Sequence, residues 1–262
     1  LKVSKNIDYV FNMACNMGGM GFIENNKAEC MLSVLVNTNL LRACLKNKID
    51  RYFFSSSACA YNTSKQKETF IAGLKEEDAY PAMPEDGYGW EKLFSERMCR
   101  HFMEDFNLQT RVARYHNIYG PFGTYDGGRE KAPAAISRKI ASAKINNISQ
   151  IDVWGDGEQT RTFAYIDDCI IGTLKLFLSD HGEPINIGSS EQVSINQMID
   201  TIEDIADYKV KRNYQLDKPL GVRGRSSNNE KIKEVLSWEP QISLREGLTK
   251  TYNWINNQLL HS

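Results

Sequence analysis

Apolar runs alternate with amphipathic segments along the first two thirds of the chain. The apolar run over Tyr9–Ala14 predicts a buried strand, and further strands are expected over Arg51–Ser57 and Gln109–Tyr115. Residues 27–47 carry apolar side chains at helical spacing, and another helix is expected over residues 88–105. Strands that alternate with helices in this way are typical of parallel βαβ units, so the pattern predicts an α/β fold.

The rest of the chain has more turns and ends in helices. Turn signals between residues 118 and 129 precede a helix expected near Pro133–Lys144, and Ile151–Trp154 is predicted to be a short strand. A helix near 170–178 and a strand near 184–188 follow, and three more helices are expected near residues 195–208, 229–236 and 244–260. This change of pattern indicates a second structural unit.

The composition is that of an ordinary globular protein. The 262 residues are 41% hydrophobic and 25% charged, with a net charge of -1, so no electrostatic footprint for nucleic acid is present. No apolar run reaches the length of a membrane span, and the first residues do not resemble a signal peptide. The six cysteines show no metal-ligand spacing, so reduced thiols in a cytoplasmic protein are expected, without a metal, nucleic-acid or membrane partner.

A candidate catalytic group combines Tyr88 and Lys92 with Ser57. Tyr88 and Lys92 are four residues apart on a predicted helix and therefore share one face, and Ser57 ends the preceding strand. A lysine cation lowers the pKa of a nearby phenol, which suits removal of a proton from a sugar hydroxyl while hydride leaves the same carbon. An exposed Tyr/Lys pair without catalytic function is the alternative.

A cluster of glycines, Gly18-Gly19-Met20-Gly21, follows the first predicted strand. Ligands bind outside the carboxyl ends of strands in open α/β sheets, so this loop is a candidate binding element. It does not match GxGxxG, and a tight turn without a ligand is the alternative.

Longer motifs add a resemblance to these patterns. They are Ser56-Ser57-Ala58-Cys59, Tyr88-Gly89-Trp90-Glu91-Lys92, residues 114–121, Trp154-Gly155-Asp156-Gly157 and residues 236–240. Together they resemble the extended short-chain dehydrogenase/reductase family of nucleotide-sugar epimerases and dehydratases. Residues 17–22, 127–135 and 221–225 are similar to the branch of that family that epimerises GDP-mannose at C3 and C5.

The resemblance implies a doubly wound, Rossmann-like parallel sheet that binds NAD, with a smaller substrate-binding domain. Residues 1–117 and about 158–190 would form the first, and about 118–157 and 191–262 the second. NAD would oxidise C4 of the hexose, the ketone would acidify C3 and C5, and the products would be GDP-L-galactose and GDP-L-gulose. A homodimer that pairs through two long helices is also implied.

Site residues follow from the same resemblance. Cys59, two residues past Ser57, would point into the same pocket as a proton-transfer thiol, and Lys131 would supply the opposing acid. A buried structural thiol and a solvated loop cation are the alternatives. The implied catalytic residues are Tyr88, Lys92, Ser57, Cys59 and Lys131; the cofactor-binding residues are Tyr88, Lys92, Ala14 and Tyr115; and the substrate-binding residues are Gly18, Met20, Asn117, Glu130, Lys131, Lys139, Gln159, Arg223 and Arg225. Exposed surface arginines are the alternative for the last two.

The chain also departs from the family pattern. Asn16 and Asn62 stand where the family has Asp and Pro, and the opening strand, GxxGxxG turn and helix are not in the sequence. We therefore expect a fragment with an exposed edge over Tyr9–Ala14, weak NAD binding, no turnover alone and poor solubility. A degenerate sugar-nucleotide-binding or scaffold protein is one alternative. A UDP-hexose 4-epimerase or dTDP-glucose 4,6-dehydratase is another, although Ala58-Cys59 stands where a dehydratase has Asp-Glu.

Overall fold

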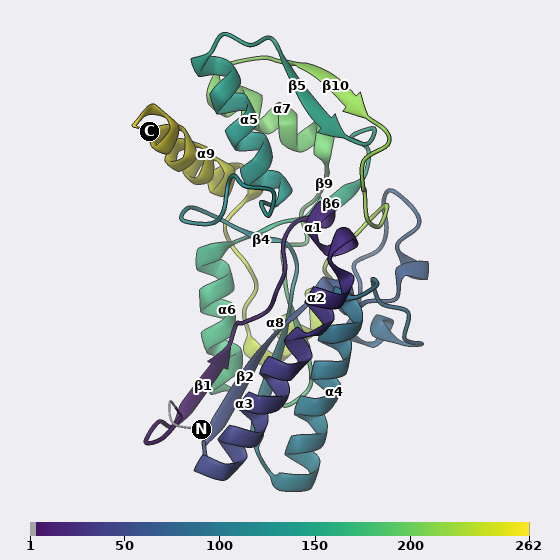
Figure 1. The fold of residues 1–262 in the computed structure, drawn as a ribbon, viewed down its shortest axis with the longest axis vertical. Helices are drawn as coiled ribbons and strands as arrows, with labels where there is room; N and C mark the ends of the chain where they lie inside the picture. Colours follow the sequence, from purple (N-terminus) through teal and green to yellow (C-terminus); the bar gives the residue numbers. More distant parts are fainter. Residues whose placement is uncertain (1–3, 262) are drawn as a thin grey trace.

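A four-stranded parallel sheet organises the larger part of the computed structural model, which describes residues 4–261 (Figure 1). Its strands are β1 (Tyr9–Asn12), β2 (Arg51–Ser57), β3 (Gln109–Tyr115) and β8 (Ile185–Ile187), in the order β1-β2-β3-β8. β2 and β3 are paired in register along their whole length, from Arg51 opposite Gln109 to Ser57 opposite Tyr115. The predicted α/β fold with a parallel sheet is confirmed.

Helices cover both faces of this sheet, because successive side chains of its strands point to opposite faces. On one face, Tyr52 and Phe54 pack with residues of α3 (Ser33–Asn47) and α4 (Tyr88–Phe106). On the other face, Phe53 packs with residues of α6 (Ile166–Leu178) and α8 (Glu230–Leu236). Figure 1 shows the resulting layers, with α3 and α4 on one side of the strands and α6 on the other.

The remaining helices share a different core. α5 (Ala132–Ile145), α7 (Ile195–Ala206) and α9 (Leu244–Leu260) pack around Ile140, Met198 and Leu248, next to the parallel pair β5 (Gln150–Trp154) and β10 (Lys211–Gln215). This separate core supports the proposed division into a Rossmann-like and a smaller domain.

Short elements connect the two cores. β4 (Ile118–Tyr119) pairs with β7 (Ala164–Tyr165), and β6 (Thr160–Thr162) pairs antiparallel with β9 (Gln192–Ser194). Three 3₁₀ turns lie in the loops after β2, at Ala58–Ala60, Thr63–Lys65 and Glu76–Ala79.

The structure differs from the expected elements in the short strands β4, β6, β7 and β9, which were not predicted, and at three further places. The helix expected over residues 27–47 is divided at Leu32 into α2 (Lys27–Met31) and α3. The glycine cluster begins a short helix, α1 (Met20–Asn25), with Gly19 as its N-cap, where a loop was expected. The strand β10 was not predicted, because its sequence Lys-Arg-Asn-Tyr-Gln has no apolar alternation.

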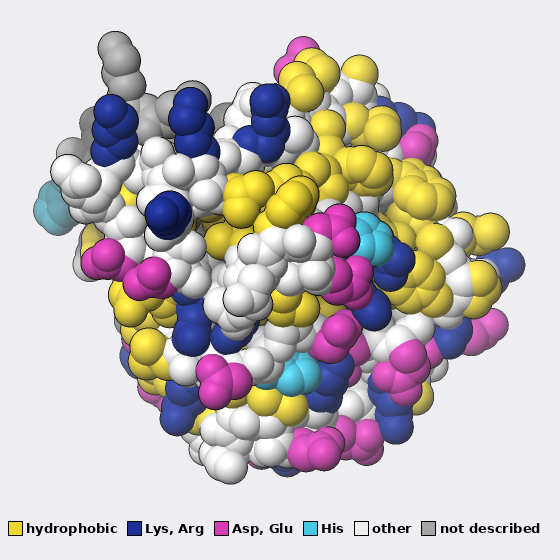
Figure 2. All heavy atoms as spheres, turned by 90° about the horizontal axis from the view of Figure 1, so that it is seen from below, with side chains coloured by type: hydrophobic (Ala, Val, Ile, Leu, Met, Phe, Trp, Pro, Cys, Tyr) yellow, Lys and Arg dark blue, Asp and Glu magenta, His cyan; other side chains and the backbone are white. Residues whose placement is uncertain are grey.

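β1 is an edge strand with exposed apolar side chains. It has a neighbour on one side only, β2, and Tyr9 and Phe11 are 55% and 40% exposed. The expected exposed edge is therefore confirmed over the four residues of β1. Figure 2 views the molecule from below and shows apolar side chains between charges of both signs on that face.

Two features of residues 4–261 bear on the kind of site to expect. No helix among them has the length and apolar character needed to cross a membrane. No group of three or more His, Cys, Asp and Glu side chains is arranged there to hold a metal ion, and all six cysteines are free.

Candidate active site

A cavity of about 460 Å³ opens at the carboxyl ends of β2 and β3, between the two cores. Most of the residues that the sequence predicted for the site line it: Gly18, Met20, Ser57, Cys59, Tyr88, Tyr115, Asn117, Glu130, Lys131, Lys139, Gln159 and Arg225. Segments far apart in the sequence therefore meet at one cavity, in the position that ligands occupy in open α/β sheets.

The loop after β2 brings the thiol of Cys59 next to the start of α4. Ser57 ends β2, and its hydroxyl accepts a hydrogen bond from the Cys59 N–H at 3.2 Å. Gly89, in the first turn of α4, lies so close that an added Cβ would be 2.3 Å from the Cys59 carbonyl oxygen. The absence of a side chain at Gly89 therefore lets the Cys59 loop pack directly against the residue after Tyr88.

Tyr88 is buried in the cavity wall with only 5% of its surface exposed. Burial raises the pKa of its phenol well above the ordinary value, the nearby Cys15 and Cys59 thiols raise it further, and the Ser57 hydroxyl lowers it. The net shift is upward because burial outweighs the groups that favour the ionised phenol.

Lys92 lies behind the cavity wall and does not line it. Its ammonium group is 5.4 Å from the centre of the Tyr88 ring and 4.8 Å from that of Phe54, and it pairs with Glu91 at 3.4 Å. The ammonium is buried and makes no hydrogen bond of good geometry, so it keeps donor capacity for a further partner.

Cys59 and Lys131 both line the cavity but come from opposite parts of the chain. Cys59 is 8% exposed, and burial together with the charge of Glu85 raises the pKa of its thiol to about 11, against the opposing charge of Arg225. Lys131 is the N-cap residue of α5, and desolvation lowers the pKa of its ammonium while Cys59 raises it. Burial therefore favours the uncharged form of both groups, the protonated thiol and the neutral amine.

Arginine and glutamine side chains form a polar wall. Arg225 is 4% exposed, and its Nε donates to Gln66 Oε1 at 2.7 Å. Gln159 donates from Nε2 to the Trp154 carbonyl at 3.0 Å, which leaves its buried Oε1 without a hydrogen-bond partner. Such an unpaired acceptor next to a cavity is suited to binding a donor group of a ligand.

The sequence did not predict Arg161, which also lines the cavity. It donates hydrogen bonds to the carbonyl oxygens of Thr160 and Leu220 at 2.7 and 3.0 Å. Its position two residues after Gln159 could have indicated that it faces the same cavity, because alternate residues of a strand share a face.

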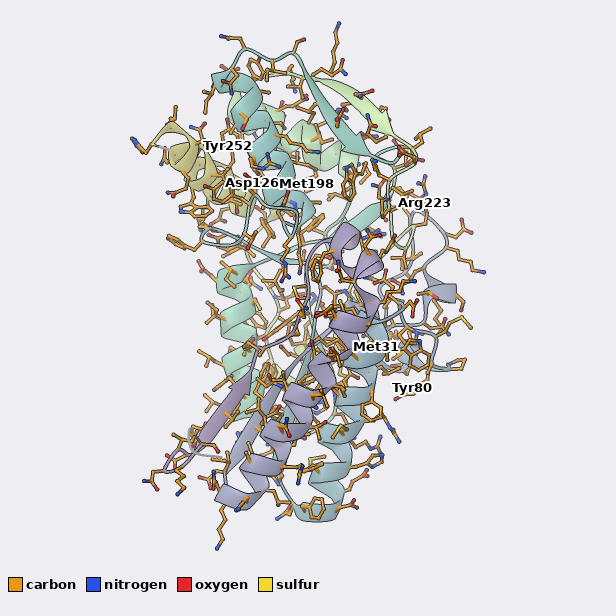
Figure 3. All side chains as sticks on the ribbon, viewed as in Figure 1. Met31, Tyr80, Asp126, Met198, Arg223 and Tyr252 are labelled. Atoms are coloured by element: carbon orange, nitrogen blue, oxygen red, sulfur yellow. The ribbon has the colours of Figure 1, made fainter. Side chains whose placement is uncertain are left out.

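Besides Lys92, two predicted residues do not line the cavity. Arg223 pairs with Asp156 at 2.9 Å, its side chain is 31% exposed, and Figure 3 shows it at the margin of the molecule. Ala14 lies beyond the end of β1, where its N–H donates to Asn12 Oδ1 at 3.2 Å.

Lys139 and Asn117 line the cavity with their polar ends already bonded. Lys139 donates to the Asp152 carbonyl at 2.7 Å, and Asn117 donates to the Thr162 carbonyl at 2.9 Å. Both would exchange or share these bonds to hold a ligand.

A family model described as NAD dependent epimerase/dehydratase family matches residues 2–188. The chain belongs to this family. The resemblance to nucleotide-sugar epimerases and dehydratases is thereby confirmed.

Similar proteins extend the match beyond the sheet. A "GDP-mannose 3,5-epimerase" of Arabidopsis thaliana is 48% identical over 260 residues, covering 99% of this chain and 68% of that protein. A "GDP-mannose 3,5-epimerase 1" of Oryza sativa subsp. indica is also 48% identical and is covered to 67%.

Among solved structures, a UDP-glucose 4-epimerase from Thermotoga maritima with UDP-glucose has a TM-score of 0.85 at 26% identity, covering 96% of this chain and 78% of that one. A UDP-glucuronic acid 4-epimerase from Bacillus cereus in complex with UDP-glucuronic acid and NAD has a TM-score of 0.82 at 27% identity, covering 98% and 78%.

The residues of this NAD-dependent epimerase/dehydratase chain fit the cofactor at the cavity. The buried Lys92 ammonium has no hydrogen-bond partner within residues 4–261, so it can donate a hydrogen bond to a hydroxyl group of a ligand. Tyr88, Ser57 and Tyr115 line the cavity in front of it. The cavity wall therefore presents the Tyr88 phenol and the Ser57 hydroxyl, and the Lys92 ammonium lies behind the phenol.

Proposed function

We propose that this protein epimerises GDP-mannose at C3 and C5, giving GDP-L-galactose and GDP-L-gulose through a transient 4-keto sugar. The observation that carries the proposal is that Cys59 and Lys131 line the same cavity as Tyr88. The relatives named GDP-mannose 3,5-epimerase, 48% identical over 99% of the chain, support the substrate.

Tyr88 acts on the C4 hydroxyl in this proposal. Bound NAD supplies the hydride acceptor for C4 and returns the hydride at the end of the cycle. The Tyr88 phenol exchanges the hydroxyl proton, Ser57 orients the phenol, and the buried Lys92 ammonium stabilises its ionised form. Together with Tyr115 and Ala14, Tyr88 and Lys92 are the residues that we propose hold the cofactor.

Cys59 and Lys131 act on the carbons beside the ketone. A carbonyl at C4 acidifies the protons at C3 and C5, and inversion requires that a proton leaves one face and returns to the other. We assign proton removal to Cys59 and proton return to Lys131. Burial raises the pKa of the Cys59 thiol and lowers the pKa of the Lys131 ammonium, so the thiolate is a stronger base and the ammonium a stronger acid than in water.

The polar wall holds the nucleotide and the sugar in the same proposal. Arg225 has the planar fork that suits phosphate groups, and the free Gln159 Oε1 accepts a hydrogen bond from the ligand. Gly18 and Met20 approach the sugar, and Asn117, Glu130 and Lys139 line the path to the pyrophosphate. Arg223 can join them only by leaving Asp156.

Proton exchange tests the proposal directly. The chain joined to the strand, GxxGxxG turn and helix of the family is incubated with NAD and GDP-mannose in deuterated water, and the sugar protons are followed by NMR. Loss of the C3 and C5 proton signals is expected. If neither position exchanges and UDP-glucose is converted instead, the assignment to GDP-mannose is wrong and a UDP-hexose 4-epimerase is the better description.

A homodimer and a cytoplasmic location complete the proposal. α3 and α4 pack against each other and leave Leu35, Trp90 and Phe94 at 55%, 43% and 56% exposure, and a second copy would cover these side chains. Free cysteines are typical of a reducing compartment. Light scattering of the parent and of Phe94→Glu tests the dimer, because the variant should be monomeric.

A further inference from the structure

Glu85 is a buried carboxylate that the proposed reaction does not use. It lies in the loop before α4, and its side chain is 11% exposed. Both carboxylate oxygens are buried, and neither accepts a hydrogen bond of good geometry. Because burial of a charged group in this condition is costly, its presence beside the active site needs a physical reason.

The backbone ties Glu85 to the reactive loop. The Glu85 N–H donates a hydrogen bond to the carbonyl oxygen of Cys59 at 3.0 Å. The residue is therefore fixed against the segment that carries the thiol.

Arg225 bridges the carboxylate and the thiol. Its Nη2 lies 3.2 Å from Glu85 Oε2, and its Nη1 donates to Cys59 Sγ at 3.5 Å. The third nitrogen, Nε, is held by Gln66. One guanidinium thus touches both groups at once, and its orientation is set from behind.

We propose that Glu85 is a positioning residue that balances the charge of Arg225 and keeps the Cys59 thiol protonated in the resting enzyme. An arginine beside a cysteine stabilises the thiolate, which is the reactive form toward electrophiles and oxidants. The Glu85 carboxylate opposes this effect on the same guanidinium. The inference rests on the proposed function, in which Cys59 exchanges a proton with the sugar.

The charges around both groups agree with this role. Burial and then Glu85 raise the pKa of the Cys59 thiol, and Arg225 lowers it. Burial also raises the pKa of Glu85, but Arg225, Cys59 and Arg161 more than offset this, so the carboxyl pKa is lowered and the group is ionised at neutral pH. The other titratable or hydrogen-bonding groups that act on either residue are Ser57, Tyr88, Lys131, Arg161 and Glu24.

The rate of Cys59 alkylation tests the inference without any turnover. Parent and Glu85→Gln proteins are treated with iodoacetamide between pH 7 and 12, and the modified Cys59 peptide is quantified by mass spectrometry. The midpoint is expected to fall by about one pH unit in Glu85→Gln, which makes alkylation about tenfold faster at pH 8. Glu85→Asp, which keeps the charge, should restore a midpoint near that of the parent.

A neighbouring carboxylate supplies the matched control. Asp86 is the next residue, its side chain is 67% exposed, and it pairs with Lys27 at 2.7 Å. Asp86→Asn removes the same charge one residue away and should leave the Cys59 midpoint unchanged.

A second variant keeps the test decisive if Glu85→Gln does not fold. Arg225→Gln removes the opposing charge, so the midpoint should rise. An unchanged or raised midpoint in folded Glu85→Gln, or an unchanged or lowered one in Arg225→Gln, overturns the inference. The alkylation requires neither sugar nor cofactor. A shifted midpoint in a protein that exchanges no sugar protons would therefore reject the proposed function and leave the charge balance established.

Discussion

The Lys92 ammonium lies 5.4 Å from the centre of the Tyr88 ring, and the Lys92 side chain, which is next to Glu91, is only 1% exposed. It is thus held close to the phenol by packing, at a position that solvent does not reach. Within residues 4–261 it forms one ion pair, with the carboxylate of Glu91. Activity and stability therefore both depend on this one cation.

Replacing Lys92 with methionine should lower both quantities. The turnover number should fall by about 10²-fold or more, because the phenol loses the cation that favours its ionised form. Stability should fall by about 3 kcal/mol, because Glu91 is left as a buried charge without its partner. Steady-state kinetics and thermal unfolding measure the two effects. The double variant Glu91→Gln/Lys92→Met should recover part of the stability and none of the activity. If it recovers no stability, the single variant is destabilised by lost packing and not by the unpaired charge of Glu91.

Cys59→Ser and Lys131→Ala should each suppress deuterium exchange at C3 and C5 by about 10²–10⁴-fold. Binding of GDP-mannose should change little, because these groups act on carbon-bound protons. Calorimetry measures the binding and NMR the exchange. Cys44→Ser, at a buried thiol of the α3 core, is the control for the loss of a thiol as such. Exchange at near-parental rates in either site variant would make that residue structural.

The buried pair of Arg114 and Glu96 should be important for stability. The guanidinium binds the carboxylate with two hydrogen bonds of 3.0 and 2.7 Å, and the Ser56 hydroxyl binds it as well. Glu96→Gln should destabilise the protein by about 3 kcal/mol, since a buried arginine loses its counter-ion. For a protein of this size the melting temperature should fall by roughly 6–12 °C. Glu104→Gln, on the exposed end of the same helix, should shift it by much less.

His116 predicts a loss of stability in mild acid. It is fully buried against Asn186, and burial lowers the pKa of its imidazole to about 3. The unfolded chain, with an ordinary value of 6.5, therefore binds more protons between these two pH values, and stability falls as the pH falls through that window. Between pH 7 and pH 4.5 the parent should lose roughly 3 kcal/mol more than His116→Gln does.

Urea unfolding at the two pH values measures this difference. His101→Gln is the matched control, since it removes an imidazole whose side chain is 51% exposed. Equal pH dependence in the parent and in His116→Gln would show that the imidazole does not control acid stability.

The central strands were predictable from the sequence to the residue. The strands Arg51–Ser57 and Gln109–Tyr115 are each bounded by turns. Helices cover both faces of the sheet at these strands, so no alternative pairing of the two strands competes. β10 was missed because it is a polar edge strand that gains its pairing from β5 rather than from its own apolar pattern. α1 was missed because its first turn contains glycines, which local propensity disfavours in helices.

The site was predictable where the topology brings strand ends together. Ser57 and Tyr115 end neighbouring strands, so their meeting at one cavity follows from a parallel sheet. Glu85 and Arg161 were missed because their places depend on how distant loops pack, which no short-range pattern records. Arg223 was assigned to the cavity, but it pairs with Asp156 instead. This ion pair joins residues that are 67 positions apart in the sequence, so no short-range pattern indicates it.

The bare Cα at Gly89 has a mechanical consequence for the two reacting groups. Because the Cys59 carbonyl occupies the space of a side chain at this position, the loop and the helix cannot slide past each other independently. The position of the Cys59 thiol is therefore tied to that of the Tyr88 phenol through a contact between their backbones. If one of these groups shifts toward a sugar carbon, the other shifts with it. The distance between the Tyr88 phenol and the Cys59 thiol is therefore fixed by the protein backbone and does not depend on which ligand is bound.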